Sequence, residues 1–571
     1  MNIEVATGPG AQNKLESQDL REHWNRLYNE CPWGSVYQSD NFILTWYETY
    51  SSVFTPLIVI GKTETGSVCG LFFLAVNNET GQLVVAGASH AEYQVWLADI
   101  QAGNVFIECA LDRLKEMFPD RTLTLLFVLP KTPVAWAQIG GRWAHQCQIK
   151  TLPRGLLSIG DGSSFKDTLR KKKQNKVNRL KRLGNLHFDH ITDPDQMDSL
   201  FDEFSVLQNL RLRAIYNLSE IDNDPLKKAL YIKLMRIPAF LYTTVLRLDR
   251  TLVSAQIHTY NKDQLLLGLI THSPFYAKYS PGSLHLLMLG IELGKQNVPI
   301  FDLTPGGDYK DRYATSYDQV YVINVFFRKR DAIRNRLKTK ITNAVKRIMS
   351  LLRVSPVAVK ERYLTFLDWK QKWVRMPKSS WVAGFAGWMQ KRLWIKEEFC
   401  LYGLDYSRCS SASQPELTLN RDSIRDLLTY RPRETEHLPV NRFLRRAMQL
   451  FEIGGHVYTR VENDELVFCG WLIQQPDRDS TSWLERTLLR GENTILATAL
   501  GSHTVKAGHF KIFIRQLVKD VVSGSLEKEL ICAIPVHRHE WRRIAEDEGF
   551  IFEKSITRTV RIGRENILNM P

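Results

Sequence analysis

The sequence contains little that would indicate a metal site, a disulfide framework or a membrane span. Its eight cysteines are widely scattered, and no two have the C-x-x-C spacing of zinc ribbons or thioredoxin-like motifs. No run of 18 apolar residues is present, so we expect no transmembrane helix. The polar N-terminus has no apolar core segment, so we also expect no signal peptide. Together these absences predict a cytoplasmic protein.

Low-complexity tracts are absent as well. The chain has 571 residues, of which 44% are hydrophobic and 24% charged, and this balance is typical of globular proteins. A chain of this length exceeds the size at which a single core stops growing. We therefore expect three or four folded units.

The net charge of +15 is concentrated in two segments. Residues 166–182 carry nine basic residues and one acid, and residues 328–353 carry ten basic residues and one acid. The remainder is close to neutral, which predicts a local anionic partner. Neither segment is interleaved with aromatic residues, so we expect no DNA partner.

Helix-like and strand-like segments alternate along the chain in three rounds, which predicts a mixed α+β fold with central mixed sheets flanked by helices. The first round contains the strand-like runs PLIVIGK, VCGLFFLAV and TLTLLFVL. The second contains an apolar helix after Ser-Pro-Gly and then the strand VPIFDLT. The predicted units are 1–152, 153–328, a basic and Trp-rich helical connector at 329–396, and 397–571.

The second round resembles a known family. The run YAKYSPGSLHLLMLGIELGKQNVPIFDLTPGGDYKDRYA is similar to a stretch of the CelD-like acetyltransferases of polysaccharide biosynthesis, which belong with the FemAB peptidyltransferases in the GNAT superfamily. Residues 164–213 and the opening VYQSDNFILTWYETY fit the same pattern, so the resemblance covers about residues 20–325. It implies tandem GNAT-like units at 1–152 and 153–328. Residues 397–571 resemble GNAT more weakly, as a third GNAT-like domain.

The resemblance implies acyl-CoA, and acetyl-CoA in particular, as co-substrate, with no covalently bound cofactor. A diphosphate needs unpaired N–H groups at a helix N-terminus, and small residues there permit close approach. A plain turn is the alternative for Pro-Gly, but the helix and strand that follow favour the phosphate site. In the third unit Lys-Ala-Gly-His stands at the equivalent place. The predicted cofactor-binding residues are Ser280, Pro281, Gly282, Ser283, Leu284 and Gly508.

Candidate catalytic groups lie near the ends of the predicted core strands. Family members carry a Tyr-Lys pair near the reaction centre, and a lysine there could stabilise an oxyanion, or it could be a solvated surface residue. His258 alternates with apolar residues, so we expect it to be structural. His537-x-His539 is the only metal-like pair and lacks further ligands, so no metal is predicted. The catalytic candidates are Lys310, Tyr309, Asp302 and His272, and the substrate-binding candidates are Glu92, Tyr93 and Arg211.

The predicted function is transfer of an acyl group from acyl-CoA to an amine or hydroxyl of a polysaccharide or cell-envelope precursor. Two alternatives stay open: aminoacyl-tRNA-dependent peptidyl transfer of the FemAB type, and a non-catalytic accessory protein of a polysaccharide synthase. The basic run 166–182 is either a solvated helix face or a site for CoA phosphates or an anionic acceptor. The basic helix 330–353 either docks on the core or lies on the inner membrane or a synthase complex as a peripheral contact.

Overall fold

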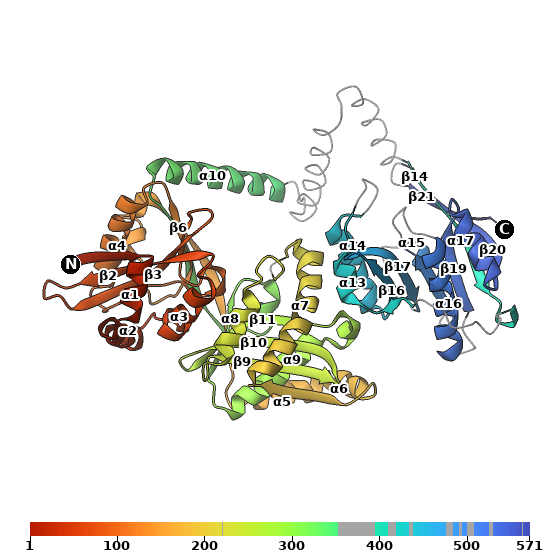
Figure 1. Cartoon of the computed structure of the whole chain (residues 1–571), viewed down its shortest axis with the longest axis horizontal. Helices are drawn as coiled ribbons and strands as arrows, with labels where there is room; N and C mark the ends of the chain where they lie inside the picture. Colours follow the sequence, from red (N-terminus) through yellow and green to blue (C-terminus); the bar gives the residue numbers. More distant parts are fainter. Residues whose placement is uncertain are drawn as a thin grey trace, which may run out of the picture. The chain divides into compact units, whose positions relative to one another are not determined.

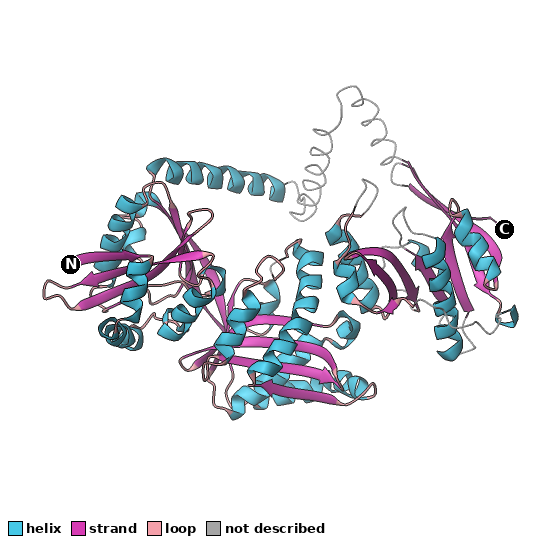
Figure 2. Ribbon diagram, viewed as in Figure 1, coloured by secondary structure: helices cyan, strands magenta, loops and turns pink. Residues whose placement is uncertain are grey.

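The computed structural model describes residues 1–219, 221–351, 394–408, 418–432, 438–474, 483–489, 494–499, 507–524, 529–561 and 564–570. Contacts divide the chain into two compact units. The first comprises Met1–Phe204, Asp224–Thr271 and Pro281–Pro356, and the second comprises Ser205–Asn223, His272–Ser280 and Val357–Pro571. Helices and strands of both units are drawn in Figures 1 and 2.

A five-stranded sheet opens the first unit. Its order is β1-β2-β3-β4 with β5 paired to β3, and its ladders are antiparallel. Helix α4 lies close against β2 and β3, because a Cβ built at Gly61 or Gly70 would stand 2.5 Å from the Phe106 ring. The elements are β1 (Asn2–Thr7), α1 (Pro9–Glu16), α2 (Gln18–Glu30), α3 (Asp40–Thr49), β2 (Phe54–Lys62), β3 (Val68–Asn77), β4 (Leu83–Val85), β5 (Leu97–Ala98) and α4 (Gly103–Met117).

An eight-stranded mixed sheet follows in the described chain, in the order β6-β13-β7-β12-β11-β10-β9-β8. Strands β11 and β12 run parallel, with α9 crossing between them. The elements are β6 (Thr122–Val128), β7 (Cys147–Ser158), α5 (Ser163–Thr168), α6 (Gln174–Lys181), β8 (Leu186–Ile191), α7 (Pro194–Tyr216), α8 (Lys227–Met235), β9 (Leu241–Leu248), β10 (Thr251–Asn261), β11 (Gln264–His272), α9 (Pro281–Lys295), β12 (Ile300–Pro305), β13 (Ser316–Phe326) and α10 (Lys329–Leu351).

Helix α9 packs into the core of this sheet. It contributes leucines to one buried cluster with Phe301 of β12 and Phe165 of α5. Each fully buried leucine stabilises the fold by about 1.5–3 kcal/mol. Small residues on α9 admit α5, since a Cβ at Gly290 would lie 2.5 Å from the Phe165 ring. The core thus fixes both the start of α9 and the position of the parallel strands.

The mixed α+β class predicted from the sequence is confirmed. The predicted boundary at 152 falls inside β7, and β6 pairs with β13, so segments from both sides of that boundary share one sheet. The ladder joins residues about 200 positions apart, a pairing that sequence periodicity cannot indicate. The basic run expected as one helix is α5, a π-helical turn at Leu169–Lys173 and α6. Up to residue 393 the expected Trp-rich helices lie outside the described residues. Trp394, expected in a helix, begins a strand, β14, so the predicted boundary at 396 falls inside that strand.

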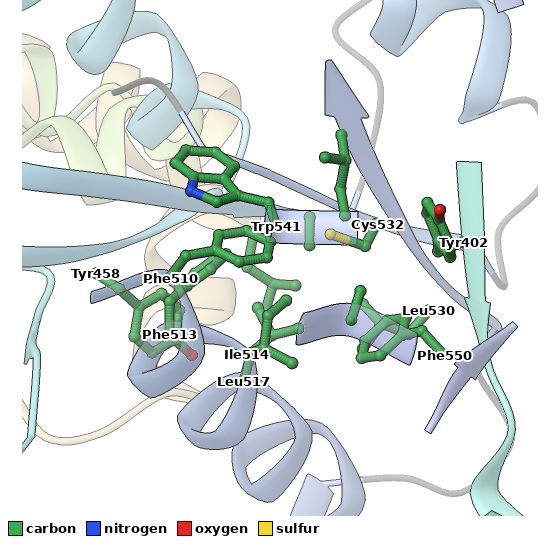
Figure 3. Packing of buried hydrophobic residues seen from close by; sticks show 14 of the residues in the cluster. Tyr402, Tyr458, Phe510, Phe513, Ile514, Leu517, Leu530, Cys532, Trp541 and Phe550 are labelled. Atoms are coloured by element: carbon green, nitrogen blue, oxygen red, sulfur yellow. The ribbon is translucent and has the colours of Figure 1, made fainter. Parts of the chain in front are cut away.

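The second unit also contains an eight-stranded mixed sheet in its described part, in the order β15-β16-β17-β18-β19-β14-β20-β21. Figure 3 shows its core, in which Phe510 of α16 stacks on Trp541 of α17 with ring centroids 4.4 Å apart. The elements are β14 (Trp394–Leu404), β15 (Asn420–Arg421), α13 (Ile424–Leu428), α14 (Val440–Glu452), β16 (His456–Glu462), β17 (Glu465–Ile473), α15 (Trp483–Leu488), β18 (Thr494–Ala499), α16 (Ala507–Gly524), β19 (Glu529–Pro535), α17 (His539–Asp547), β20 (Phe550–Arg561) and β21 (Arg564–Met570).

The two eight-stranded sheets repeat one topology. Strands β8-β9-β10-β11-β12-β7-β13 correspond in sheet order and chain order to β15-β16-β17-β18-β19-β14-β20. Each sheet has a parallel pair crossed by a helix, α9 in one and α16 in the other. In the described part of the chain, no helix is long and apolar enough to cross a membrane.

Candidate functional site

The parallel strands β11 and β12 separate soon after they meet. They pair at only three positions, from Gln264↔Ile300 to Leu266↔Asp302. Beyond that point β11 continues to His272, whereas β12 shifts register against β7 and pairs Pro305 with Arg154. In the second unit β18 and β19 instead stay paired over five positions, from Thr494↔Glu529 to Thr498↔Ala533. Divergence of the parallel pair is therefore a feature of the first unit among the described ladders.

Helix α9 begins shortly after the diverging strand. Ser280 has a left-handed backbone, with φ 56° and ψ 57°, and Pro281 is the first helical residue. Proline suits this position because its fixed φ matches the helix and no N–H is lost. The first N–H groups of a helix have no intrahelical partner and attract anions. Pro281, Gly282, Ser283 and Leu284 thus form the first turn of α9, and Tyr313 Oη donates to Ser283 Oγ at 3.1 Å.

A buried charge network lies at the point where β12 leaves β11. Asp302 is 0% exposed, and its Oδ2 accepts hydrogen bonds from Tyr93 Oη at 2.6 Å and Arg154 Nη1 at 3.2 Å. Its Oδ1 accepts from the Thr304 backbone N–H at 2.8 Å. Arg154 also pairs with Asp318, whose Oδ1 accepts from Nε at 2.7 Å. Loops and strands from both sides of residue 152 supply these groups.

Burial and charge act in opposite directions on this network. Burial raises the pKa of Asp302, while Arg154 and the hydrogen bonds from Tyr93 and Thr304 oppose that rise. Burial would lower the pKa of Arg154, but the hydrogen bond to Asp318 and the charge of Asp302 raise it above its ordinary value. Arg154 therefore stays cationic between two carboxylates. Asp302 and Tyr93 are both fully buried, and the catalytic and substrate-binding roles expected for them from the sequence stay predictions.

Thr304 adopts a strained backbone directly beside this network. Its φ of 57° lies in the left-handed region, where a β-branched residue costs about 1–3 kcal/mol. Lys310 Nζ donates to Thr304 Oγ1 at 2.9 Å and to Thr304 O at 3.1 Å. The bulge is thus held from one side by Asp302 and from the other by Lys310. Strain of this kind clusters at binding and catalytic sites.

Lys310 and Glu92 are partly exposed charged groups close to this network. Burial lowers the pKa of Lys310, against the opposing charges of Glu92 and Asp302. Lys310 and Glu92 are each half-buried, and Tyr309 is 40% exposed. Of the predicted catalytic residues, Lys310 and Tyr309 are therefore the ones that the first unit leaves open to a substrate.

Arg211 and His272 form a pair of their own in the second unit. Arg211 Nη1 lies 3.4 Å from His272 Nδ1. Burial, and then the charge of Arg211, lower the pKa of His272 to about 4, so its imidazole is neutral near pH 7. Gly508, the remaining predicted cofactor residue, stands in the first turn of α16 with open space around its Cβ position.

Sequence reasoning missed three residues of the network: Arg154, Thr304 and Asp318. Arg154 left one signal, a lone arginine inside the strand-like run CQIKTLPRGLLS. The strain at Thr304 and the pairing of Asp318 with Arg154 left none, because both arise from the register between β7, β12 and β13.

Comparison with known families assigns this region. Residues 168–313, 146 of the 571, match the model described as an acetyltransferase (GNAT) domain. This region of the chain is similar to a GNAT acetyltransferase domain. The match spans α9, both diverging strands, Asp302 and Lys310. No functionally curated protein matches the sequence.

Several solved structures are similar over just over half of the chain. FemX is 9% identical, with a TM-score of 0.38, and the match covers 55% of this chain and 97% of FemX. The C-terminal domain of a putative lysylphosphatidylglycerol synthetase from Agrobacterium fabrum is 12% identical, with a TM-score of 0.35, covering 57% and 96%. A tandem GNAT protein from the clavulanic acid biosynthesis pathway is 12% identical, with a TM-score of 0.35, covering 56% and 98%. Function does not transfer at such identities.

Proposed function

We propose that the chain is an acyl-CoA-dependent acyltransferase whose donor site is the start of α9 beside the diverging strands. The observation that carries the proposal is the separation of β11 from β12 after Leu266 and Asp302, with α9 beginning nine residues past the end of β11. Where the two parallel strands separate, backbone N–H and C=O groups of β11 no longer pair with β12. They can therefore form hydrogen bonds with the amides of a pantetheine arm. The helix N-terminus suits the pyrophosphate at the other end of that arm.

The reaction requires groups that bind the donor, polarise the thioester and transfer a proton. Backbone N–H groups of 282–284 bind the pyrophosphate, and Lys310 polarises the thioester carbonyl as negative charge develops on its oxygen. The acceptor nitrogen or oxygen attacks the carbonyl carbon, the C–S bond breaks, and the electron pair leaves with the CoA sulfur. The proton lost by the nucleophile passes to Glu92 and then to the thiolate. Tyr93, Asp302 and Arg154 hold the strand that presents these groups.

The acceptor class comes from the family resemblance. An amine or hydroxyl of a polysaccharide or cell-envelope precursor, acetylated from acetyl-CoA, is the acceptor that the CelD-like run YAKYSPGSLHLLMLGIELGKQNVPIFDLTPGGDYKDRYA implies. The basic character of the chain would favour an anionic acceptor of this class.

A second candidate, aminoacyl-tRNA-dependent peptidyl transfer, is favoured by the basic segment 166–182. Most of its nine basic side chains are exposed across α5, the π-helical turn and α6. Burial and the charges of Lys173 and Arg179 lower the pKa of Lys176, so cations crowd here. A large polyanion would relieve that repulsion.

Calorimetric titration with acetyl-CoA and longer acyl-CoAs tests the donor site. We expect wild type and Gly508→Trp to bind and Gly282→Trp to lose binding, because the indole would fill the first turn of α9. The Gly508 variant is a matched control, since it changes the same residue type in the equivalent turn of α16. Loss of binding only in Gly508→Trp would place the donor in the second unit.

The two enzyme candidates differ in the substrate that drives turnover. No acyl-CoA binding by wild type at millimolar concentration, together with turnover that depends on aminoacyl-tRNA, would replace the acyl-CoA proposal with peptidyl transfer. Failure of both assays would favour the accessory role in a polysaccharide synthase.

A further inference from the structure

Helix α10 is attached to the first unit by a polar face. Ala332 is buried, Asn335 donates to Gln148 Oε1, and Gln148 Nε2 donates to Thr339 Oγ1 at 3.0 Å. Arg336 Nη2 also donates to Ala144 O at 2.9 Å. These contacts place β7 and the short helical turn Ala144–Gln146 under one side of α10. The docked positions are spaced by three and four residues, as one helix face requires.

The opposite face of α10 is apolar and open. Ile333, Leu337 and Ile341 follow one another at intervals of four residues and are 58%, 56% and 64% exposed. At 100° per residue this stripe points away from Ala332, Asn335 and Thr339. A surface helix normally buries its apolar stripe and exposes its polar face. In α10 the polar face is docked and the apolar stripe is exposed. An exposed apolar stripe of this kind indicates a binding partner outside the first unit.

Charge indicates which occupant fits. Between residues 329 and 343 the helix carries six basic residues and one acid, Asp331. Arg330, Arg334 and Lys340 lie on the same outward side as the stripe, and all three are exposed. Long cationic side chains beside a buried apolar stripe reach the phosphates of lipid headgroups while their stems stay apolar. A neutral protein groove would leave these charges unpaired.

We propose that residues 329–343 of α10 bind the surface of an anionic phospholipid membrane. Ile333, Leu337 and Ile341 enter the boundary between headgroups and acyl chains, and the flanking lysines and arginines contact lipid phosphates. The helix lies along the surface and does not span it. This places the first unit where a lipid-linked acceptor would be presented, but membrane binding itself does not depend on the acyltransferase proposal.

Sedimentation of the full chain with vesicles tests the proposal. One set is equimolar phosphatidylglycerol and phosphatidylcholine, and the other is phosphatidylcholine alone, at low and at 0.5 M salt. The test variant is Ile333→Ser/Leu337→Ser/Ile341→Ser. A matched control, Ile100→Ser/Val105→Ser/Ile139→Ser, changes three exposed apolar residues elsewhere in the first unit. Circular dichroism melting verifies that both variants fold.

We expect wild type and the control to bind the anionic vesicles alike, and the test variant to bind at least about tenfold more weakly, because burial of apolar area sets the affinity. Replacing Arg330, Arg334 and Lys340 by glutamine should weaken binding by about fivefold per charge at low salt. High salt should weaken the wild type. Equal binding by wild type and test variant, or no binding by wild type, would overturn the proposal. A change of oligomeric state in the test variant without vesicle binding would assign the stripe to a second copy of the chain.

Discussion

At the scale of single residues, the charges around β12 support one another. Lys310 holds the strained Thr304 through two hydrogen bonds, and Asp302 holds the same residue through its backbone N–H. Burial lowers the pKa of Lys310, which places its loss of charge below the ordinary value of 10.5. An ammonium with a lowered pKa is a stronger hydrogen-bond donor to a developing oxyanion.

Replacing Lys310 by glutamine should lower kcat by about 100- to 1,000-fold, the range found when one oxyanion donor is removed. The Kd for acetyl-CoA should change little, because the donor phosphates bind at α9. As the pH rises, wild-type activity should begin to fall at a pH below 10.5, because Lys310 loses its proton there. The variant should not show this loss of activity at alkaline pH. Lys295→Gln, at the far end of α9, is the control. An unchanged kcat would make Lys310 a purely structural residue.

Asp302→Asn and Tyr93→Phe separate the buried support from the chemistry. Asp302→Asn leaves Arg154 with one carboxylate fewer, and breaking a buried ion pair destabilises by about 3–5 kcal/mol. Tyr93→Phe removes one hydroxyl that donates to Asp302 and should cost about 1–3 kcal/mol. Urea unfolding of the first unit measures both. If Asp302→Asn lowered kcat while leaving stability unchanged, Asp302 would act on the substrate after all.

At the scale of elements, α9 and β10 bury two neutral histidines. Thr244 Oγ1 and His285 Nε2 lie 2.9 Å apart, and His258 Nδ1 accepts from the Gly268 N–H at 3.3 Å. Burial lowers the pKa of both histidines to about 3, and the charge of His258 contributes at His285. The structural role expected for His258 agrees with its place in the core.

These histidines should make the first unit sensitive to acid. Each binds a proton when unfolded, near pH 6.5, but not when folded until about pH 3. Their stabilising contribution is therefore complete above pH 6.5 and is lost as pH falls toward 3, by about 1.4 kcal/mol per pH unit for each group. Hydrogen exchange of β10 and α9 peptides at pH 7.5 and 5.5 measures the slope. His285→Phe should reduce it by about half, and an unchanged slope would contradict the assignment.

At the scale of the whole molecule, one topology occurs twice with different contents. Among the described residues, the first sheet has a diverging parallel pair and carboxylates on β12 and β13, whereas β19 is apolar from 530 to 533. The second unit also has its own aromatic core around Phe513, shown in Figure 3. We infer that the donor site lies at the first turn of α9, in the first unit, and that the sheet of the second unit is not needed for donor binding.

Phe513→Ala should therefore destabilise the second unit without affecting acetyl-CoA binding. Phe513 is fully buried near Tyr458 and Phe468, with ring centroids 5.5 and 5.4 Å away, and such truncations cost about 3–5 kcal/mol. Scanning calorimetry should show one lowered transition. If the alanine variant unfolds, acetyl-CoA binding can be measured on the less destabilising variant Phe513→Leu. Weaker acetyl-CoA binding by a folded variant would show that the donor site needs the second unit.

The sequence by itself determined several local elements, including the start of the helix where we propose that the donor binds. The strand-like runs VCGLFFLAV and TLTLLFVL are β3 and β6 to within one residue. Ser-Pro-Gly before an apolar run marked the start of α9 to within one turn. These features depend on propensity and on side-chain period, which act over a few residues. Tyr309 and Lys310 were instead singled out by the family resemblance, which implies a Tyr-Lys pair just past a strand end, and their roles stay predictions.

Only the tertiary structure decided which charges meet. Arg154 reaches Asp302 and Asp318 because β7 lies between β12 and β13, two strands that follow it by more than 140 residues. The left-handed Thr304 lies at the register shift between β12 and β7. The exposure of the Ile333, Leu337 and Ile341 side chains likewise depends on which face of α10 packs against β7. Register and docking depend on contacts between distant segments, and a single sequence does not contain their geometry.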